Sequence, residues 1–425
     1  MKAAFHQRGF PLLFAGLFTS MLGDSLMLIV LAIWVKGLTG SSGAAGLTFF
    51  FMALPSLAAP VAGMFVDRAK RRTVLIWGNL ASALAMAPLL FVHDSGQVWV
   101  IYVVAVLYGI SWVVLPGALS GLLKELLPED LLVDANASLA TTKEALRLFG
   151  PLVGAGLYAW VGGGVVASID AASFVVAAGA VGALRLREAK PVREAGHWRV
   201  EFSAGIHHIW RDPTLKHTLL AVAMALLVVG FMESAVFAAV QFFGKPASFV
   251  GVVVTVQGVG AVFGGLSSAW IIRRLGESES ISLSMVLFSV GLAVAAASPW
   301  LWGYFCGTVI LGFALPVFIV ALNTLLQRRT PQRLMGRVSA ATDVLLGTPQ
   351  SGSIALGALL VTLLSFRSIF WISAVVIFGS AVYLTWALRG DAAKELPQAD
   401  PADVHVEASR PIGPLTVTTP IDPGE

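Results

Sequence analysis

Two carboxylates stand inside apolar runs of this sequence, where a charge is costly unless water or a cation reaches it. Asp24 lies near the middle of the run Pro11–Val35, and Glu233 interrupts the run Ala221–Val240. A carboxyl group whose charge depends on solvent access can bind a proton on one side of a barrier and release it on the other. We therefore predict that both residues couple protons to the protein's activity. The alternatives are a structural pairing with a neighbouring helix for Asp24 and a hydrated helix end for Glu233.

A short loop, Gly63–Arg72, holds one acid and four cations between two apolar runs. Cations in such a loop anchor it on the cytoplasmic face of a membrane. The acid needs another explanation, and it could accept hydrogen bonds from the free N–H groups of a neighbouring helix N-terminus, near residues 336–340. The loop is predicted to be a cytoplasmic gate, with an ordinary orientation signal as the alternative. The gate residues are Gly63, Asp67, Arg68, Arg71 and Arg72.

Three further charges, Lys143, Glu144 and Arg147, crowd one half of the run Ser138–Trp160. Glu144 and Arg147 are three residues apart, so they can pair along one helix face. A neutralised pair is less costly in a membrane than either charge alone. We predict that this pair is structural and belongs to a gate, with direct contact to a substrate as the alternative.

The same run continues with Gly150, Pro151 and Gly154, a combination that lets helices approach closely and kinks the segment. In other runs, polar and aromatic side chains could line a substrate cavity, or could instead join helices and face lipid. These cavity candidates are Trp34, Trp112, Phe231, Phe237, Gln241, Gln257 and Asn323. Asp170 and Asp343 are expected close to helix ends and are interpreted as structural.

The elements that must position these residues are predicted to be membrane-spanning helices. Of the 425 residues, 57% are hydrophobic and 12% are charged, whereas soluble proteins carry about 25% charged residues. A spanning helix needs about 20 apolar residues, and about twelve runs reach that length. They lie near residues 11–35, 43–66, 73–92, 98–123, 138–160, 165–186, 217–243, 249–272, 280–298, 302–326, 341–365 and 369–388.

Cations gather in alternate connectors between these runs, so the positive-inside rule places both termini in the cytoplasm. That placement requires an even number of spans. Residues 127–137 resemble residues 330–340, and each segment precedes a run at the same position in its half, which indicates a parallel duplication. The predicted fold class is all-α integral membrane, with twelve transmembrane helices in two pseudo-symmetric six-helix halves.

Four parts are expected along the chain. Residues 1–186 and 217–390 are predicted to form the two six-helix bundles. Residues 187–216 form a cytoplasmic connector, in which Glu201–Trp210 has the spacing of an amphipathic helix at the membrane interface. Residues 391–425 are rich in proline, alanine and acid and lack periodicity, which is typical of a disordered tail.

The loop Gly63–Arg72 resembles the G-x-x-x-D-R-x-G-R-R signature of the major facilitator superfamily, although Lys70 stands where glycine is usual. Gly150–Gly156 resembles the G-P-x-x-G-G antiporter motif of exporters in that family, with Ala155 replacing one glycine. Further segments resemble the branch of bacterial macrolide, tetracycline and enterobactin exporters. They are Arg8–Phe14, Leu22–Asp24, Leu127–Asn136, Ile169–Phe174, Ile209–Pro213 and Gln327–Pro331.

This resemblance implies a multi-pass transporter of the bacterial inner membrane that exports hydrophobic or amphipathic drugs in exchange for protons by alternating access. Dedicated export of one metabolite, such as a siderophore or a self-made antibiotic, is the alternative, and a non-transporting membrane receptor or scaffold is a third reading. One family feature is missing. The R-x-x-Q-G motif of many drug antiporters needs an arginine, and the run Trp99–Leu123 contains none.

The expected partners are a small-molecule substrate, protons and the lipid bilayer, and the expected state is a monomer. The sequence has no phosphate-cradling loop, nucleophile elbow or metal-ligand cluster, so neither enzymatic activity nor a cofactor or metal is expected. The single cysteine, Cys306, excludes an intrachain disulfide. The basic residues are interpreted as orientation signals and not as a nucleic-acid surface.

Overall fold

The computed structural model describes residues 5–7, 9–58, 69–184, 198–331 and 334–395. Across these residues the regular structure is helical, with no strand. The first part forms α2 (Phe10–Thr39), α3 (Ser42–Ala53), η1 (Leu54–Ala58), α5 (Arg71–Met86), η2 (Ala87–Phe91), η3 (Ser95–Gln97), α6 (Val98–Leu126), α7 (Glu129–Val161) and α8 (Gly163–Ala183). The second forms α9 (Trp198–Arg211), α10 (Pro213–Val229), α11 (Met232–Phe242), η4 (Ala247–Phe249), α12 (Val250–Leu275), α13 (Glu277–Ala297), α14 (Leu301–Arg329), α15 (Met335–Leu363) and α16 (Phe366–Glu395).

Nine helical segments of the described chain are long and apolar enough to cross a membrane. They are α2, α5 with η2, η3 with α6, α8, η4 with α12, α13, α14, α15 and α16. The other three predicted spans correspond to irregular helices. α3 with η1 covers only Ser42–Ala58 before the described residues stop, α7 carries several charges, and α10 and α11 are separated by Gly230 and Phe231.

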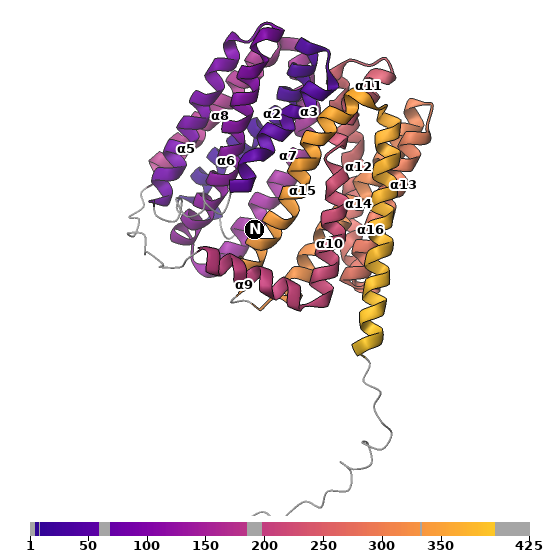
Figure 1. Cartoon of the computed structure of the whole chain (residues 1–425). Coiled ribbons are helices and arrows are strands. Elements are labelled where there is room, and N and C mark those ends of the chain that lie inside the picture. Colours follow the sequence, from indigo (N-terminus) through magenta and orange to yellow (C-terminus); the bar gives the residue numbers. More distant parts are fainter. Residues whose placement is uncertain (1–4, 8, 59–68, 185–197, 332–333, 396–425) are drawn as a thin grey trace, which may run out of the picture.

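Figure 1 shows two groups of helices side by side, α2 to α8 and α10 to α16. In the first group α2 packs on α7 and α8, α5 packs on α6 and α8, and α3 packs on α6. The second group repeats these pairings, because α10 packs on α15 and α16, α13 on α14 and α16, and α12 on α14. This repetition is the pseudo-symmetry expected of a duplicated six-helix unit.

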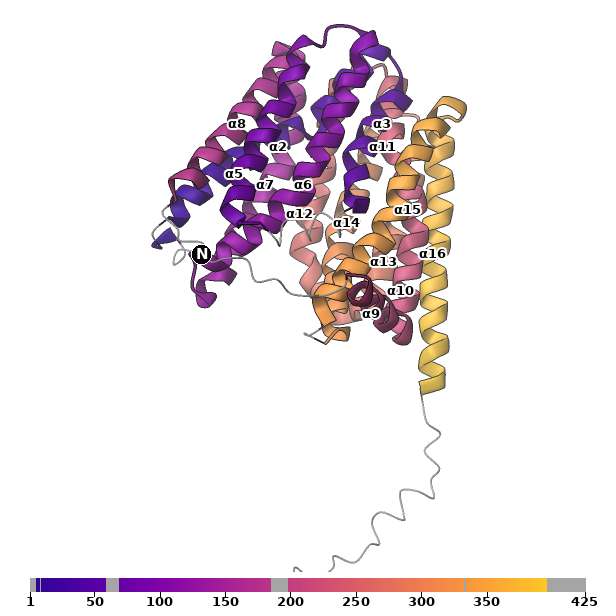
Figure 2. The ribbon, with the colours of Figure 1, turned by 60° about the vertical axis from the view of Figure 1, so that its left-hand side comes forward.

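The two ends of the bundle are formed by different segments of the chain. At the upper end, drawn at the top of Figure 1, helices are joined by turns at Gly40, Gly162 and Gly244, whose φ angles are 67°, 82° and 68°. Side chains rarely tolerate such positive φ angles, which is why glycine occupies these turns. The lower end holds α9 and the first turns of α5 and α15 (Figure 2).

Helix α9 covers the segment predicted to be an amphipathic helix and turns by 106° away from α10. It packs across the start of α15, where Gly205 lies against the carbonyl of Arg337. His208 Nε2 lies 3.0 Å from the carbonyl oxygen of Arg329, and Ile209 is buried. The described part of the connector is therefore attached to the second group of helices.

Candidate functional site

The first acid predicted from the sequence, Asp24, lies in α2 and is held by a residue of α6. The hydroxyl of Tyr108 donates a hydrogen bond of 2.6 Å to Asp24 Oδ1. Tyr108 is 1% exposed, and its ring packs beside Trp112, with 5.3 Å between ring centroids. A buried phenol needs a partner for its hydroxyl, so this contact fixes the position of the carboxyl group.

A second carboxyl group, Asp170, lies beside the first. We expected it close to a helix end, but it stands two turns inside α8 and is 0% exposed. A side chain at Gly23 would collide with Asp170 Oδ1 and with the hydroxyl of Ser173. The absence of a side chain at Gly23 therefore lets Asp170 lie against the backbone of α2, next to Asp24.

The charges of α7 face two different partners. Lys143 lies close enough for its charge to act on Asp24, whereas the charge of Arg147 acts on Glu233 of α11. Arg147 and Glu233 belong to opposite groups of helices, so this electrostatic interaction crosses between them. The predicted pairing of Arg147 with Glu144 involves a side chain that lies outside the part of the chain described.

Glu233 stands in the first turn of α11, directly after the break at Gly230 and Phe231. Negative charge is favoured at a helix N-terminus. The break lies tightly against α15, because a side chain at Gly230 would meet the backbone of Ile354, and one at Gly357 would meet that of Phe231. Packing against α15 therefore fixes the place where Glu233 enters the bundle.

A buried lysine joins the two groups at the upper end. The ammonium group of Lys36, in a residue that is 9% exposed, donates to Gln241 Oε1 at 2.6 Å. It also donates to the carbonyl of Gly40 at 2.6 Å and to the hydroxyl of Ser42 at 2.9 Å. Lys36 was not among the site residues predicted from the sequence. The sequence feature that could have identified Lys36 is that it is one of few cations near the uncharged connectors of that end.

Close helix crossings between the groups also lie towards the upper end. Gly46 of α3 faces Ser234 of α11 so closely that a side chain would overlap the serine. A side chain at Gly43 would meet the backbone carbonyl of Ala358 in α15, and one at Gly251 of α12 would meet the side chain of Ala155 in α7. Small residues allow the helices to approach this closely. The upper end is therefore closed in this conformation.

The predicted glycine-proline motif lies where α7 crosses α2. Side chains at Gly150 and Gly154 would collide with Ser25 and with the carbonyl of Leu26. The hydroxyl of Ser25 donates a hydrogen bond of 2.5 Å to the carbonyl of Leu146, just before Pro151. The motif therefore places α7, with its charges, directly against the helix that carries Asp24.

The cavity candidates separate into packed and exposed side chains. Trp34 lies against Gly163, and Phe231 and Phe237 are 5% and 1% exposed, so all three are packed among helices. Phe237 contacts Phe49 of α3 with 6.4 Å between ring centroids, another contact between the groups. The remaining candidates are more accessible: Trp112, Gln241, Gln257 and Asn323.

Within the predicted basic gate, Gly63, Asp67 and Arg68 lie outside the described residues. Arg72 donates to the carbonyls of Val181, at 3.2 Å, and Gly182. These carbonyls stand in the last turn of α8, where cations are favoured.

Replacing Arg72 with alanine is expected to lower the free energy of unfolding by about 1–2 kcal/mol, since two carbonyls lose a charged donor. The thermal midpoint of the purified protein should fall, and Arg72→Lys should restore part of the loss. An unchanged midpoint for the alanine variant would contradict this role.

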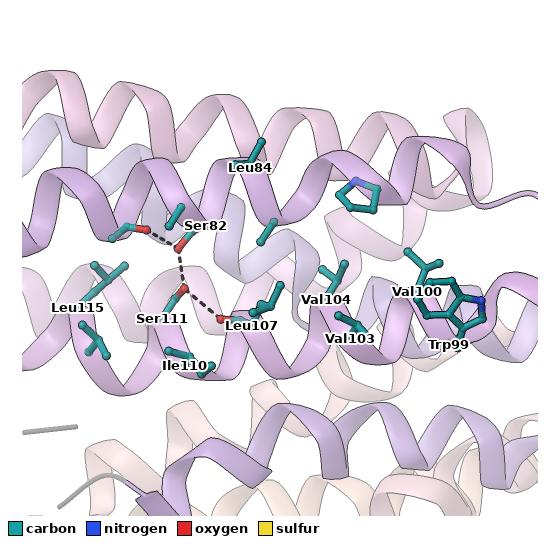
Figure 3. Close-up of a pocket in the computed structure, with 15 residues that line it drawn as sticks. Ser82, Leu84, Trp99, Val100, Val103, Val104, Leu107, Ile110, Ser111 and Leu115 are labelled. Carbon is teal, nitrogen blue, oxygen red and sulfur yellow. Dashed lines mark hydrogen bonds between the residues drawn. The ribbon is translucent and has the colours of Figure 1, made fainter. Parts of the chain in front are cut away.

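A pocket of about 550 Å³ lies between α5 and α6 (Figure 3). Its lining is apolar apart from Ser82 and Ser111, whose hydroxyl oxygens lie 2.6 Å apart. Trp99 and Leu84 on its rim are 65% and 74% exposed. An open, apolar pocket of this kind suits lipid chains better than a charged substrate.

Comparison with known proteins identifies relatives along most of the chain. The family model described as the Major Facilitator Superfamily matches residues 13–348. An uncharacterized MFS-type transporter of Bacillus subtilis (strain 168), YfiS, is 28% identical over 351 residues, covering 79% of this chain and 82% of the relative. The multidrug efflux pump Tap of Mycolicibacterium fortuitum is 26% identical, covering 77% and 82%. The multidrug resistance protein MdtG of Enterobacter lignolyticus (strain SCF1) is 26% identical, covering 93% and 95%.

Solved structures share the fold at low sequence identity. A bacterial homologue of the iron transporter ferroportin in an inward-facing state has a TM-score of 0.68 and 17% identity, covering 89% of this chain and 98% of that chain. A single-substitution mutant of the nucleoside transporter NupG has a TM-score of 0.70 and 12% identity, covering 88% and 99%.

Proposed function

The chain belongs to the Major Facilitator Superfamily, and on that premise we propose that it exports hydrophobic or amphipathic small molecules in exchange for protons. Membership makes it a membrane transporter with a small-molecule substrate. Export is supported by its similarity to two proteins named for multidrug efflux and resistance. Exchange for protons is supported by the acidic residues that lie among apolar helices.

The observation that carries the proposal is the position of the acids relative to α7. Asp24 belongs to the first group of helices and Glu233 to the second, and each is acted on by a different cation of α7, Lys143 or Arg147. A cation beside a carboxylate favours its charged form. When the two groups of helices move apart, Glu233 and Arg147 separate, so the affinity of Glu233 for a proton depends on the conformation.

Alternating access supplies that movement. The proposed domains are the six-helix bundles 1–186 and 217–390, which rock against each other about a central site. The upper end, closed by Lys36 and the Gly46 crossing, is assigned to the outside by the positive-inside rule. The lower end, with the connector 187–216 and the tail 391–425, is then cytoplasmic, as are both termini. In this arrangement the basic loop with Asp67 would close the cytoplasmic side when the upper end opens.

Everted membrane vesicles test the coupling. Vesicles containing the protein should accumulate the lipophilic cation rhodamine 6G when a pH gradient is imposed, and should lose it when an uncoupler is added. Vesicles from cells without the protein are the control. Accumulation that survives the uncoupler would contradict proton coupling. If the vesicles accumulate no drug from a panel of several chemical classes, dedicated export of one metabolite would be favoured instead.

A further inference from the structure

Two carboxyl groups from different helices, Asp24 of α2 and Asp170 of α8, lie in the same region of the first group of helices. Asp170 Oδ1 lies against Gly23, the residue that precedes Asp24 in α2. The charges of Asp24 and Asp170 act on each other, and both act on the hydroxyl of Tyr108. The three side chains therefore form one cluster, built from α2, α6 and α8.

The two carboxyl groups differ in access and in hydrogen bonding. Asp24 is partly exposed, whereas Asp170 is 0% exposed. Among the described residues, Asp170 Oδ2 has no hydrogen-bond partner, and Oδ1 has only the hydroxyl of Ser173, at 3.4 Å. A buried carboxylate oxygen without a partner is costly. A proton on Asp170, or one shared with Asp24, removes most of that cost.

The described side chains around the pair do not neutralise two negative charges. The groups that face the pair are Tyr108 from α6, which is neutral, and Lys143 from α7, whose charge acts on Asp24. Trp112 of α6 also contacts Asp24 and carries no charge. The neighbouring α3 and η2 contain no titratable side chain, and in α5 the titratable side chains are Arg71 and Arg72, in its first turn at the lower end. Among the side chains that the structure describes, one cation, Lys143, is therefore identified beside the two carboxyl groups, which favours keeping one proton between them.

We propose that Asp24 and Asp170 form a single proton-binding site in which one proton is held by the pair, with Tyr108 fixing the geometry. This assignment rests on the proposed function, and it adds Asp170 and Tyr108 to the residues of coupling. A proton from water adds to a carboxylate oxygen of Asp24, the accessible member, and the protonated carboxyl can then donate to Asp170. Release reverses these steps through Asp24. Two interacting carboxyls of this kind titrate as a unit.

Infrared titration of the purified full-length protein in phosphatidylethanolamine–phosphatidylglycerol vesicles tests the pair without a substrate. The carbonyl stretch of a protonated, buried carboxyl should be present in the wild type. Because the proton is shared, Asp24→Asn and Asp170→Asn should each shift or remove the same band. Asp343→Asn, which alters an exposed acid of α15, is the control and should leave that band unchanged. A band that Asp170→Asn does not move would overturn the proposal.

Tyr108→Phe covers the case in which Asp170→Asn does not reach the membrane, since it keeps both carboxyls and removes only the hydroxyl that bonds Asp24. The band should shift in this variant, and an unmoved band would again contradict a shared site. Proton release on addition of rhodamine 6G separates this proposal from the wider one. No release from the wild type would count against proton-coupled export. Release from the wild type that Asp170→Asn leaves intact would count against the pair alone.

Discussion

Asp24→Asn is expected to abolish uphill, pH-driven export while leaving substrate binding in place. Asparagine keeps the size of the side chain and can still accept the hydrogen bond from Tyr108, but it cannot bind and release a proton. Transport down a substrate gradient does not need that proton and should persist. We expect accumulation in everted vesicles to fall to the level of vesicles without the protein, whereas equilibrium binding of rhodamine 6G changes by less than about threefold.

The matched control is Asp343→Asn, an equivalent replacement of an exposed acid in α15. It should accumulate substrate like the wild type. Retained uphill transport by Asp24→Asn would refute the role of this residue. The test would then pass to Glu233→Gln, which removes the acid facing Arg147.

Gly46→Val is expected to stop transport by preventing closure of the upper end. Any side chain at Gly46 overlaps the side chain of Ser234 in the opposite group and also approaches the Cα atom of Ser234. Overpacking within a core costs about 1–3 kcal/mol, but here the two helices can relieve it by separating. The variant should therefore fold, insert and remain open at the upper end.

Thiol labelling from outside intact cells measures that opening. In a background with Cys306→Ser, a cysteine placed at Ala235, which is 0% exposed, should react with a membrane-impermeant reagent faster in Gly46→Val than without it. Gly179→Val is the control, because nothing lies within 4 Å of a side chain added at Gly179. Equal labelling in the two valine variants, with normal export by Gly46→Val, would rule out this crossing as a closure.

The fold class could be predicted from the sequence because each membrane-spanning segment must satisfy its own backbone hydrogen bonds. Each long apolar run therefore predicts one helix. A run such as Pro11–Val35 must be a helix, since backbone groups in a bilayer bond within their own segment, and α2 runs from Phe10 to Thr39. Three of the twelve predicted spans stay predictions, because the helices found there are short, charged or broken. The break at Gly230 is one case, because it depends on a close contact with α15 that no local pattern records.

The candidate site was less predictable because its contacts join helices that are distant in the sequence. Asp24 was predicted because burying a carboxylate in an apolar run is costly. Tyr108 and Asp170 are 84 and 146 residues away from it. Their interactions with Asp24 depend on how the helices are arranged in space. Helical spacing suggested that Arg147 pairs with Glu144, which stays a prediction, and it could not show that the charge of Arg147 also acts on Glu233 of the other group. A tyrosine in an apolar run was the available signal for Tyr108, but Tyr102 stands in the same run.

The attachment of α9 to the second group has a mechanical consequence. Through Gly205, His208 and Ile209 this helix is fixed to α14 and α15, so it moves with that body as one unit. Among the described residues, the second group therefore carries an additional helix at its lower end that the first group does not have. The distance between a fluorophore on α9 and one on α6 would therefore be a sensitive measure of the motion. A small rotation of the two groups about the crossing near Gly46 produces a large change in this distance at the lower end.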